Sequence, residues 1–263
     1  MELNGRPVTP DDLSALGLYN YGHFTSMRVE QGGRVRGLSL HLDRLLHDCR
    51  ALHGVVLDMD LVRHLVRRAV TAVTLPTIVR VTVFDPALDL GHPGTDANPG
   101  IMVSARPAST GTLPALKLRS AQYERELPEV KHVGLFGTVR HRRAAQLDGY
   151  DDVLFIDDKS RVSEGATWNV AFLRDGKVLW PRSNWLPGVT MRLVTDLMER
   201  AGIDFENVEI TLDEIGAMEA AFVTNAAIGV RPIRSIDEIK FVANRPIISR
   251  LQDEYAAIPG EFL

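Results

Sequence analysis

The chain has 263 residues, 45% of them hydrophobic and 24% charged, which are ordinary proportions for a globular protein with one or two sizeable cores. A formal net charge of −4 argues against a surface that coats nucleic acid, and no apolar run approaches the roughly 20 residues of a membrane span. The single cysteine, Cys49, can form neither an intrachain disulfide nor a CxxC metal site. We therefore expect a cytoplasmic protein without a bound metal, a nucleic-acid partner or a membrane anchor.

Hydrophobic spacing and turn residues predict alternating strands and helices in the first hundred residues. Residues 22–29, GHFTSMRV, alternate in polarity and precede a Gln-Gly-Gly turn, which is typical of a β-hairpin. Leucines and Cys49 at helical spacing then predict a helix that stops at Gly54. In chain order we expect a hairpin at 22–29 and 34–38, helices at 39–54 and 59–73, and strands at 77–84 and 100–105.

The segment 106–114, RPASTGTLP, combines two prolines, a glycine and three hydroxyl residues, as linkers do. We place an N-terminal α+β domain at 1–108, the linker at 109–115 and a C-terminal α+β domain at 116–263. The elements expected after the linker are strands at 115–121 and 152–157, a helix at 138–148, a hairpin at 169–181 with an Asp-Gly turn, a helix at 189–201, strands near 207–211 and 220–224, and a last helix opened by Pro246.

Only five of the 30 basic residues are lysines, so the surroundings of each lysine are informative. Four lie in polar or turn-rich contexts, among them Lys240 in the exposed-helix pattern DEIK, whereas Lys131 lies between Val130 and HVGLFG in the C-terminal domain. Desolvation lowers the pKa of a lysine and makes its amine nucleophilic, as Schiff-base chemistry requires. The competing interpretation is a lysine at a strand end whose stem is buried and whose amine reaches solvent.

Glu164 is a carboxylate among small residues, in the stretch SEGAT. Space beside a carboxylate allows a planar ring to approach it. A carboxylate held against a pyridine nitrogen keeps that nitrogen protonated and the ring an effective electron sink. A helix-capping or surface glutamate is the alternative.

Three stretches are candidate anion sites. LPGVT, which ends at Thr190, leads into a helix whose first N–H groups and positive dipole end suit a phosphate, although a plain threonine near an N-cap is common. Arg44 in HLDRL could bind a phosphate bidentately, or could instead be a surface arginine paired with Asp48. The small residues of 224–227, TNAA, end a strand in a turn whose amides could face a ligand.

In this order HLDRL, the isolated lysine, SEGATWN, LPGVT and TNAAIGVRPI resemble the class IV aminotransferase family. These are the pyridoxal-phosphate enzymes of fold type IV, which include branched-chain and D-amino-acid aminotransferases, (R)-selective amine transaminases and aminodeoxychorismate lyases. The resemblance extends from GHFTSMRV to about Ile233. It implies two α+β domains with the cofactor between them, and a homodimer.

The resemblance also implies a role for each candidate residue. Lys131 would hold pyridoxal 5'-phosphate as a Schiff base and then move a proton at the substrate α-carbon, and Glu164 would pair with the pyridine nitrogen. The residues implied to bind the phosphate are Arg44, Val189, Thr190, Asn225 and Ala226. The residues expected on the substrate side are Phe24, Met27, Arg80 and Ala227.

Three positions depart from the family pattern. A threonine is frequent at the position of Ala226, so one phosphate hydroxyl contact is lost there. Branched-chain enzymes carry a tyrosine where this chain has Phe136, which leaves the partner of the cofactor ring hydroxyl unassigned. Lyases and D-amino-acid enzymes carry an arginine-glycine pair where Phe84 and Asp85 stand, so the substrate carboxylate clamp is unassigned unless Arg80 substitutes.

The first functional hypothesis is a transaminase that exchanges an amino group between an amino acid or amine and a 2-oxo acid. The close alternative is 4-amino-4-deoxychorismate lyase, because GHFTS, HLDRL with its following helix and the TNA turn look more lyase-like than branched-chain-like. The missing arginine-glycine pair argues against the lyase. A third hypothesis, from a different class, is a cofactor-binding paralogue that does not turn over.

Overall fold

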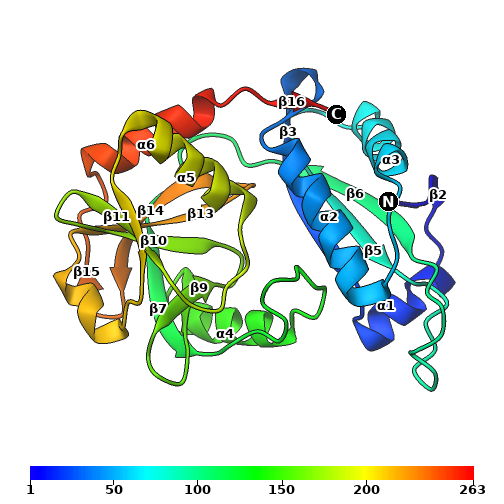
Figure 1. The fold of residues 1–263 in the computed structure, drawn as a ribbon, viewed down its shortest axis with the longest axis horizontal. Helices are drawn as coiled ribbons and strands as arrows, with labels where there is room; N and C mark the ends of the chain where they lie inside the picture. Colours follow the sequence, from blue (N-terminus) through cyan, green and yellow to red (C-terminus); the bar gives the residue numbers. More distant parts are fainter. The chain divides into compact units, whose positions relative to one another are not determined.

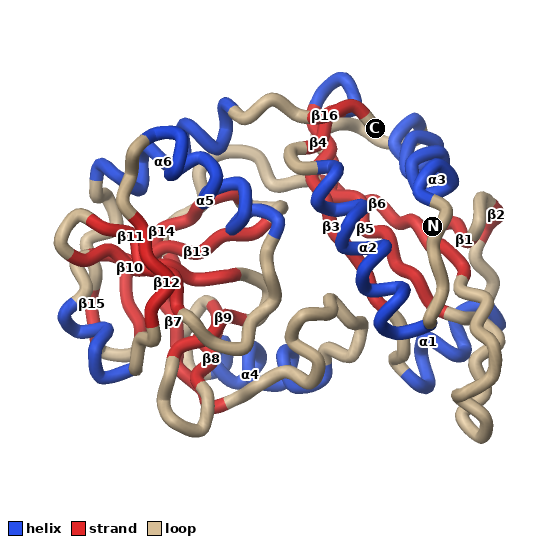
Figure 2. The backbone as a smooth tube through the Cα atoms, in the orientation of Figure 1, coloured by secondary structure: helices blue, strands red, loops and turns tan.

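The computed structural model describes all residues from Met1 to Leu263 and divides into two compact units. The first comprises Met1–Thr110, Val130–Gly134 and Pro259–Leu263, and the second comprises Gly111–Glu129 and Leu135–Ile258. Figure 1 labels helices and strands in both units where there is room, and Figure 2 distinguishes helices from strands by colour. None of the helices has both the length and the apolar character needed to cross a membrane.

A seven-stranded sheet forms the first unit together with two helices that pack on one of its faces (Figure 2). Its strand order is β16-β4-β3-β5-β6-β1-β2, and the pairings are antiparallel. The elements are β1 (Glu2–Leu3), β2 (Arg6–Pro7), η1 (Asp11–Leu13), α1 (Ser14–Tyr19), β3 (His23–Glu30), η2 (Gln31–Gly33), β4 (Arg34–Val35), α2 (Leu38–His53), α3 (Met59–Thr71), β5 (Thr77–Phe84), β6 (Gly100–Pro107) and β16 (Glu261–Phe262).

The core of this unit lies between the sheet and helices α2 and α3. Leu42, Leu45 and Cys49 of α2 recur at helical spacing and pack on Met27 and Val29, which project from β3 toward the helices. The helix ends where a glycine adopts the left-handed conformation, at residue 54. The hairpin, the two helices and the two strands predicted for this half of the chain are confirmed.

The second unit contains a nine-stranded sheet and three α-helices. The order is β12-β11-β10-β13-β14-β7-β8-β9, and β15 pairs with β14. The elements are β7 (Leu116–Gln122), α4 (Phe136–Leu147), β8 (Asp152–Ile156), β9 (Val162–Gly165), β10 (Asn169–Arg174), β11 (Lys177–Pro181), α5 (Val189–Ala201), β12 (Phe205–Val208), η3 (Leu212–Ala217), β13 (Ala220–Asn225), β14 (Gly229–Ile236), β15 (Ile239–Lys240) and α6 (Pro246–Ala257).

This second sheet curls back on itself, because β9 pairs with β8 and also with β10 through Glu164 and Asn169. One core fills one face of the curled sheet, and a second core lies on the other face beneath α5 and α6. Asp175 and Gly176 both have positive φ, as the predicted two-residue turn between β10 and β11 requires. The closure places Glu164 at a junction of three strands.

In the fold itself, an expected helix and the expected domain of Lys131 differ from the structure. Lys240 belongs to strand β15 rather than to an exposed helix, because Ile239 pairs with Ile236 and completes a hairpin on β14. The segment Val130–Gly134 packs with the first unit, whereas chain order put Lys131 in the C-terminal domain. Long-range strand pairing, described below, is the physical reason for that second difference.

Candidate active site

Lys131 is held on the first unit by backbone pairing with strand β3. Its carbonyl accepts a hydrogen bond from the Phe24 N–H at 2.9 Å, and the Val133 N–H donates to the Gly22 carbonyl at 2.9 Å. Strand β4 pairs with β3 only at the far end of this edge, so the edge around His23 is open to the lysine segment. The Lys131 side chain therefore projects from a backbone segment that is hydrogen-bonded to β3.

A buried carboxylate fixes the same segment from helix α2. Oδ2 of Asp48 accepts the Lys131 backbone N–H at 3.0 Å, and Oδ1 lies 3.0 Å from Nδ1 of His47. The Asp48 side chain is 1% exposed, so these charge-assisted bonds compensate its desolvation. The sequence had suggested Asp48 only as a surface partner for Arg44, and its bond to Lys131 was not foreseen.

Phe24 and Arg80 lie beside the Lys131 amine. Nζ of Lys131 is 5.0 Å from the centre of the Phe24 ring, and the Arg80 guanidinium carbon is 3.6 Å from the same centre. Both cations are placed to interact with the π-face of the ring. Burial lowers the pKa of the Arg80 guanidinium, whose Nε donates to the Thr82 hydroxyl at 3.2 Å.

Met27 does not join this group, which corrects its assignment to the substrate side. Its side chain is fully buried in the core beneath α2 and α3. Successive side chains of a strand point to opposite faces, so Met27 and Phe24 lie on opposite faces of β3. The sequence located both residues on one strand but did not distinguish the two faces.

His41 brings a neutral ring to the same side of α2 as Arg44 and Asp48, because residues at i, i+3 and i+7 share a helix face. Its Nδ1 lies 2.7 Å from Oγ1 of Thr25, while its Nε2 is buried with no hydrogen-bond partner in the protein. Burial, followed by the charges of Arg44 and Lys131, lowers the pKa of His41 to about 3. HLDRL thus contributes two residues, His41 and Arg44, to the helix face that also carries Asp48, and the sequence singled out only Arg44.

Glu164 is buried in the second unit and forms an ion pair that the sequence did not reveal. Its Oε1 accepts from Nε of Arg125 at 2.8 Å, and its Oε2 accepts from the Leu186 N–H at 3.2 Å. Both side chains of the pair are less than 10% exposed, so the surface and helix-cap alternatives for Glu164 are wrong. Arg125 was missed because it lies in a loop 39 residues from Glu164, without a local pattern.

The small residue after Glu164 serves the packing of this unit. A Cβ at Gly165 would collide with the indole of Trp168, which occupies that space. The Trp168 indole N–H donates to the Asp152 carboxylate at 2.8 Å, so the ring is held where it is. Gly165 is therefore required for the packing of Trp168, in addition to any space that it leaves for a planar ligand.

Val189 and Thr190 begin helix α5, as expected. The N-cap is Gly188, which offers no side-chain cap, so Thr190 is not a plain N-cap threonine. Its buried hydroxyl lies 3.4 Å from the hydroxyl of Tyr255, on helix α6. The positive end of the α5 dipole is thus accompanied by two hydroxyl groups.

The turn after strand β13 is organised by one side chain. Oδ1 of Asn225 accepts the N–H groups of Ala227 at 2.9 Å and Ile228 at 3.0 Å, and its Nδ2 donates to the Thr167 carbonyl at 3.1 Å. Asn225 therefore holds the turn together, and the amide of Ala227 is used within it. The amide of Ala226 is the one in this turn that Asn225 does not bind.

Known proteins share both the sequence pattern and the fold. The family model of amino-transferase class IV matches residues 22–236. A branched-chain-amino-acid aminotransferase from Pseudomonas aeruginosa is 24% identical over 261 residues, covering 90% of this chain and 83% of that protein. A probable branched-chain-amino-acid aminotransferase from Rickettsia felis matches over a shorter stretch, with 25% identity over 67% of this chain, which spans 64% of that protein.

Solved structures extend the likeness in three dimensions. A protein from Legionella pneumophila provisionally assigned as a 4-amino-4-deoxychorismate lyase superposes with a TM-score of 0.85 at 22% identity, covering 96% of each chain. A hypothetical aminotransferase from Mycobacterium tuberculosis in its PLP-bound form has a TM-score of 0.81 at 18% identity, covering 97% of this chain and 94% of that one. The family match over most of the chain, together with these likenesses, shows that the protein belongs to the class IV aminotransferases, enzymes of the transaminase and lyase kind with the two-unit type IV fold.

Proposed function

We propose that the protein is a pyridoxal-phosphate-dependent aminotransferase that moves an amino group between an amino acid or amine and a 2-oxo acid in the cytoplasm. The observation that carries the proposal is Lys131, which is fixed through its backbone by β3 and Asp48 with its amine beside the Phe24 ring. Relatives of the same family are aminotransferases, and one structure of the same fold was solved with the cofactor bound. Transfer of an amino group through a covalent link to the enzyme needs a lysine whose position is fixed.

The polar groups of the chain fit pyridoxal phosphate. The uncapped start of α5 and the hydroxyl of Thr190 suit a phosphate, and the buried Glu164 carboxylate suits a protonated ring nitrogen. Nε2 of His41 and Oγ1 of Thr224 are among the buried polar atoms that have no hydrogen-bond partner in the protein, as expected where a ligand completes the bonding. Arg44 adds a cation beside the first of these atoms.

The roles of the residues follow from their chemistry. Pyridoxal phosphate, when bound, supplies an aldehyde for a lysine amine and a protonated ring that withdraws electrons from the substrate. Lys131 would bind it covalently and, once displaced by the substrate amine, hold and move a proton at the α-carbon. Glu164, anchored by Arg125, would hold the proton on the ring nitrogen. Arg44, the amides of Val189 and Thr190 and the Ala226 amide would bind the phosphate.

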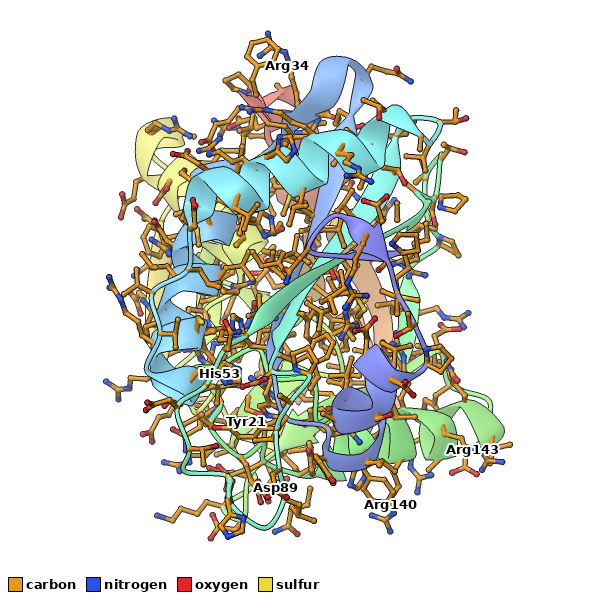
Figure 3. All side chains as sticks on the ribbon, turned by 90° about the vertical axis from the view of Figure 1, so that its right-hand side faces the viewer. Tyr21, Arg34, His53, Asp89, Arg140 and Arg143 are labelled. Atoms are coloured by element: carbon orange, nitrogen blue, oxygen red, sulfur yellow. The ribbon has the colours of Figure 1, made fainter.

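Helix α4 supports a homodimer as part of the proposal. Phe136, Val139 and Leu147 are 83%, 56% and 69% exposed and lie along one side of this helix with Arg140 and Arg143, which Figure 3 labels. Exposed apolar residues gathered on one side are typical of an interaction surface.

A second copy of this chain is the partner that the family implies. Phe136→Glu should therefore shift the protein toward monomer in sedimentation velocity. An unchanged sedimentation coefficient would exclude α4 from the contact.

Borohydride trapping tests the proposed function directly. Protein incubated with pyridoxal phosphate should absorb visible light, and after reduction peptide mapping should locate the cofactor on Lys131. Lys131→Ala should abolish both signals, while Lys177→Ala, which removes an exposed lysine paired with Glu206, should leave them unchanged. Failure to bind the cofactor, or labelling of another lysine, would contradict the proposal.

A donor screen then separates the enzyme classes. Consumption of a 2-oxo acid with amino acids or amines of either configuration is the expected result. Release of pyruvate from 4-amino-4-deoxychorismate without a 2-oxo acid would instead support the lyase. A protein that takes up the cofactor but turns over neither set of substrates would support a non-catalytic paralogue.

A further inference from the structure

Three buried hydroxyl groups lie on elements of the second unit that contact one another, helix α5 with helix α6 and with strand β13. Thr190 belongs to α5 itself, Tyr255 belongs to α6 and Thr224 belongs to β13. The oxygens of Thr190 and Tyr255 are 3.4 Å apart, at the long end of the hydrogen-bond range. All three side chains are buried, so each needs a polar partner in the folded protein.

Tyr255 is positioned by packing. Its ring belongs to the core between α6 and the sheet, where Ile248 and Leu251 of the same helix are fully or almost fully buried. The ring lies against Gly229, since a Cβ there would be 3.0 Å from two of its carbons, and the glycine has a φ of +66° that disfavours other residues. Gly229 opens β14 directly after the Asn225 turn. The Tyr255 ring therefore reaches from this turn to the start of α5.

Thr224 gives an independent sign of a ligand at the same place. It pairs with Val230, a member of the core beneath α5 and α6, and with Asn169, so its side chain faces that side of the sheet. Asn169 donates to the Leu186 carbonyl and lies so close to Gly188 that a Cβ there would collide with it. The Thr224 hydroxyl, 1% exposed at the residue level, has no hydrogen-bond partner in the protein.

We propose that the Tyr255 hydroxyl, together with that of Thr190, donates a hydrogen bond to the phosphate of the cofactor. The inference rests on the proposed pyridoxal-phosphate function. A phosphate oxygen only accepts hydrogen bonds, and hydroxyl donors beside the positive end of a helix dipole suit it. Ala226, in the neighbouring turn, has a methyl group and no hydroxyl to donate. Tyr255 is then a cofactor-binding residue contributed by the last helix of the chain.

Binding of two related compounds tests the role of the hydroxyl. Tyr255→Phe removes only this oxygen and leaves the ring on Gly229. Its dissociation constant for pyridoxal phosphate should rise on the order of tenfold, while that for pyridoxal, which lacks the phosphate, should not change. Tyr150→Phe, in the separate cluster near α4, is the matched control and should bind both compounds like the parent protein.

The possible failures are distinguishable. An unchanged affinity of Tyr255→Phe for pyridoxal phosphate, or equal losses for both compounds, would overturn the role of the hydroxyl. A parent protein that binds neither compound, or binds both equally, would instead contradict the proposed cofactor function. Thermal unfolding of the cofactor-free proteins should show the same midpoint for Tyr255→Phe and the parent. An equal midpoint means that weaker binding by the variant does not result from a loss of folded protein.

Discussion

The backbone N–H of Lys131 donates to Oδ2 of Asp48 at 3.0 Å, although the two residues are 83 positions apart in the chain. Through this bond helix α2 sets where the proposed Schiff-base lysine leaves the backbone. Because the same helix carries His41 and Arg44 on the same face, it aligns the lysine with the groups proposed to face the cofactor. Asp48 is therefore a positioning residue in this proposal.

Removing Asp48 should loosen the lysine segment. Asp48→Ala leaves the half-buried Lys131 N–H without its acceptor, which costs about 1–3 kcal/mol of unfolding free energy. Denaturant unfolding measures this cost, and the visible absorbance of the cofactor-loaded protein should fall as well. Asp48→Asn retains an acceptor oxygen and should lose less. Asp43→Ala, an exposed site on the same helix, is the control, and equal behaviour of Asp43→Ala and Asp48→Ala would disprove the role.

Substituting either member of the buried ion pair between Arg125 and Glu164 should have a large effect, on the free energy of unfolding or on the reaction. Arg125→Met leaves a buried carboxylate without its cation, which costs on the order of 3–5 kcal/mol. Glu164→Gln keeps the shape of the side chain and should still allow covalent attachment to Lys131, yet slow the proton transfers that a protonated ring assists. Single-turnover kinetics and borohydride labelling separate these effects. If Glu164→Gln reacts at the parent rate, the carboxylate does not serve the ring nitrogen.

Arg80 is the candidate clamp for a substrate carboxylate. Its guanidinium lies on the Phe24 ring beside Lys131, so Arg80→Met should raise KM for amino acids by about tenfold or more while changing KM little for amines without a carboxylate. Comparing the two donor classes in the same variant is the measurement. Equal effects on both classes would place the carboxylate elsewhere.

Two buried histidines predict a loss of stability in mild acid. Burial lowers the pKa of His23 to about 3, with a further contribution from His53, and His41 is lowered to a similar value by burial and by Arg44 and Lys131. The unfolded chain binds protons below the ordinary value of 6.5, whereas the folded chain does not. The free energy of unfolding therefore falls as the pH drops from about 6.5 toward about 3, by about 1.4 kcal/mol per pH unit for each ring.

A single substitution checks this pH dependence. His23→Phe removes one of the two rings, so unfolding measured between about pH 6 and about pH 5 should show a slope smaller by about 1.4 kcal/mol per pH unit. An identical slope in His23→Phe and the parent would show that His23 is protonated in the folded protein.

Local patterns in the sequence determined the helices, the hairpins and the positions of the chemically important residues. The leucine stripe of α2 and the Asp175-Gly176 turn are read from neighbours a few positions apart, because helix periodicity and turn conformation depend on short stretches of chain. The same stretches located Lys131 and Glu164 and, through the resemblance, the family. The family and the fold type were predicted and are confirmed.

Only the tertiary structure decided what those residues touch. Lys131 meets Asp48 across 83 residues, Thr190 meets Tyr255 across 65, and Glu164 meets Arg125 across 39. Each contact depends on which strand edge is open, which face a side chain takes and how helices pack. These are properties of the folded chain that no short segment encodes, because a change of one residue in register turns every side chain of a strand to the other face.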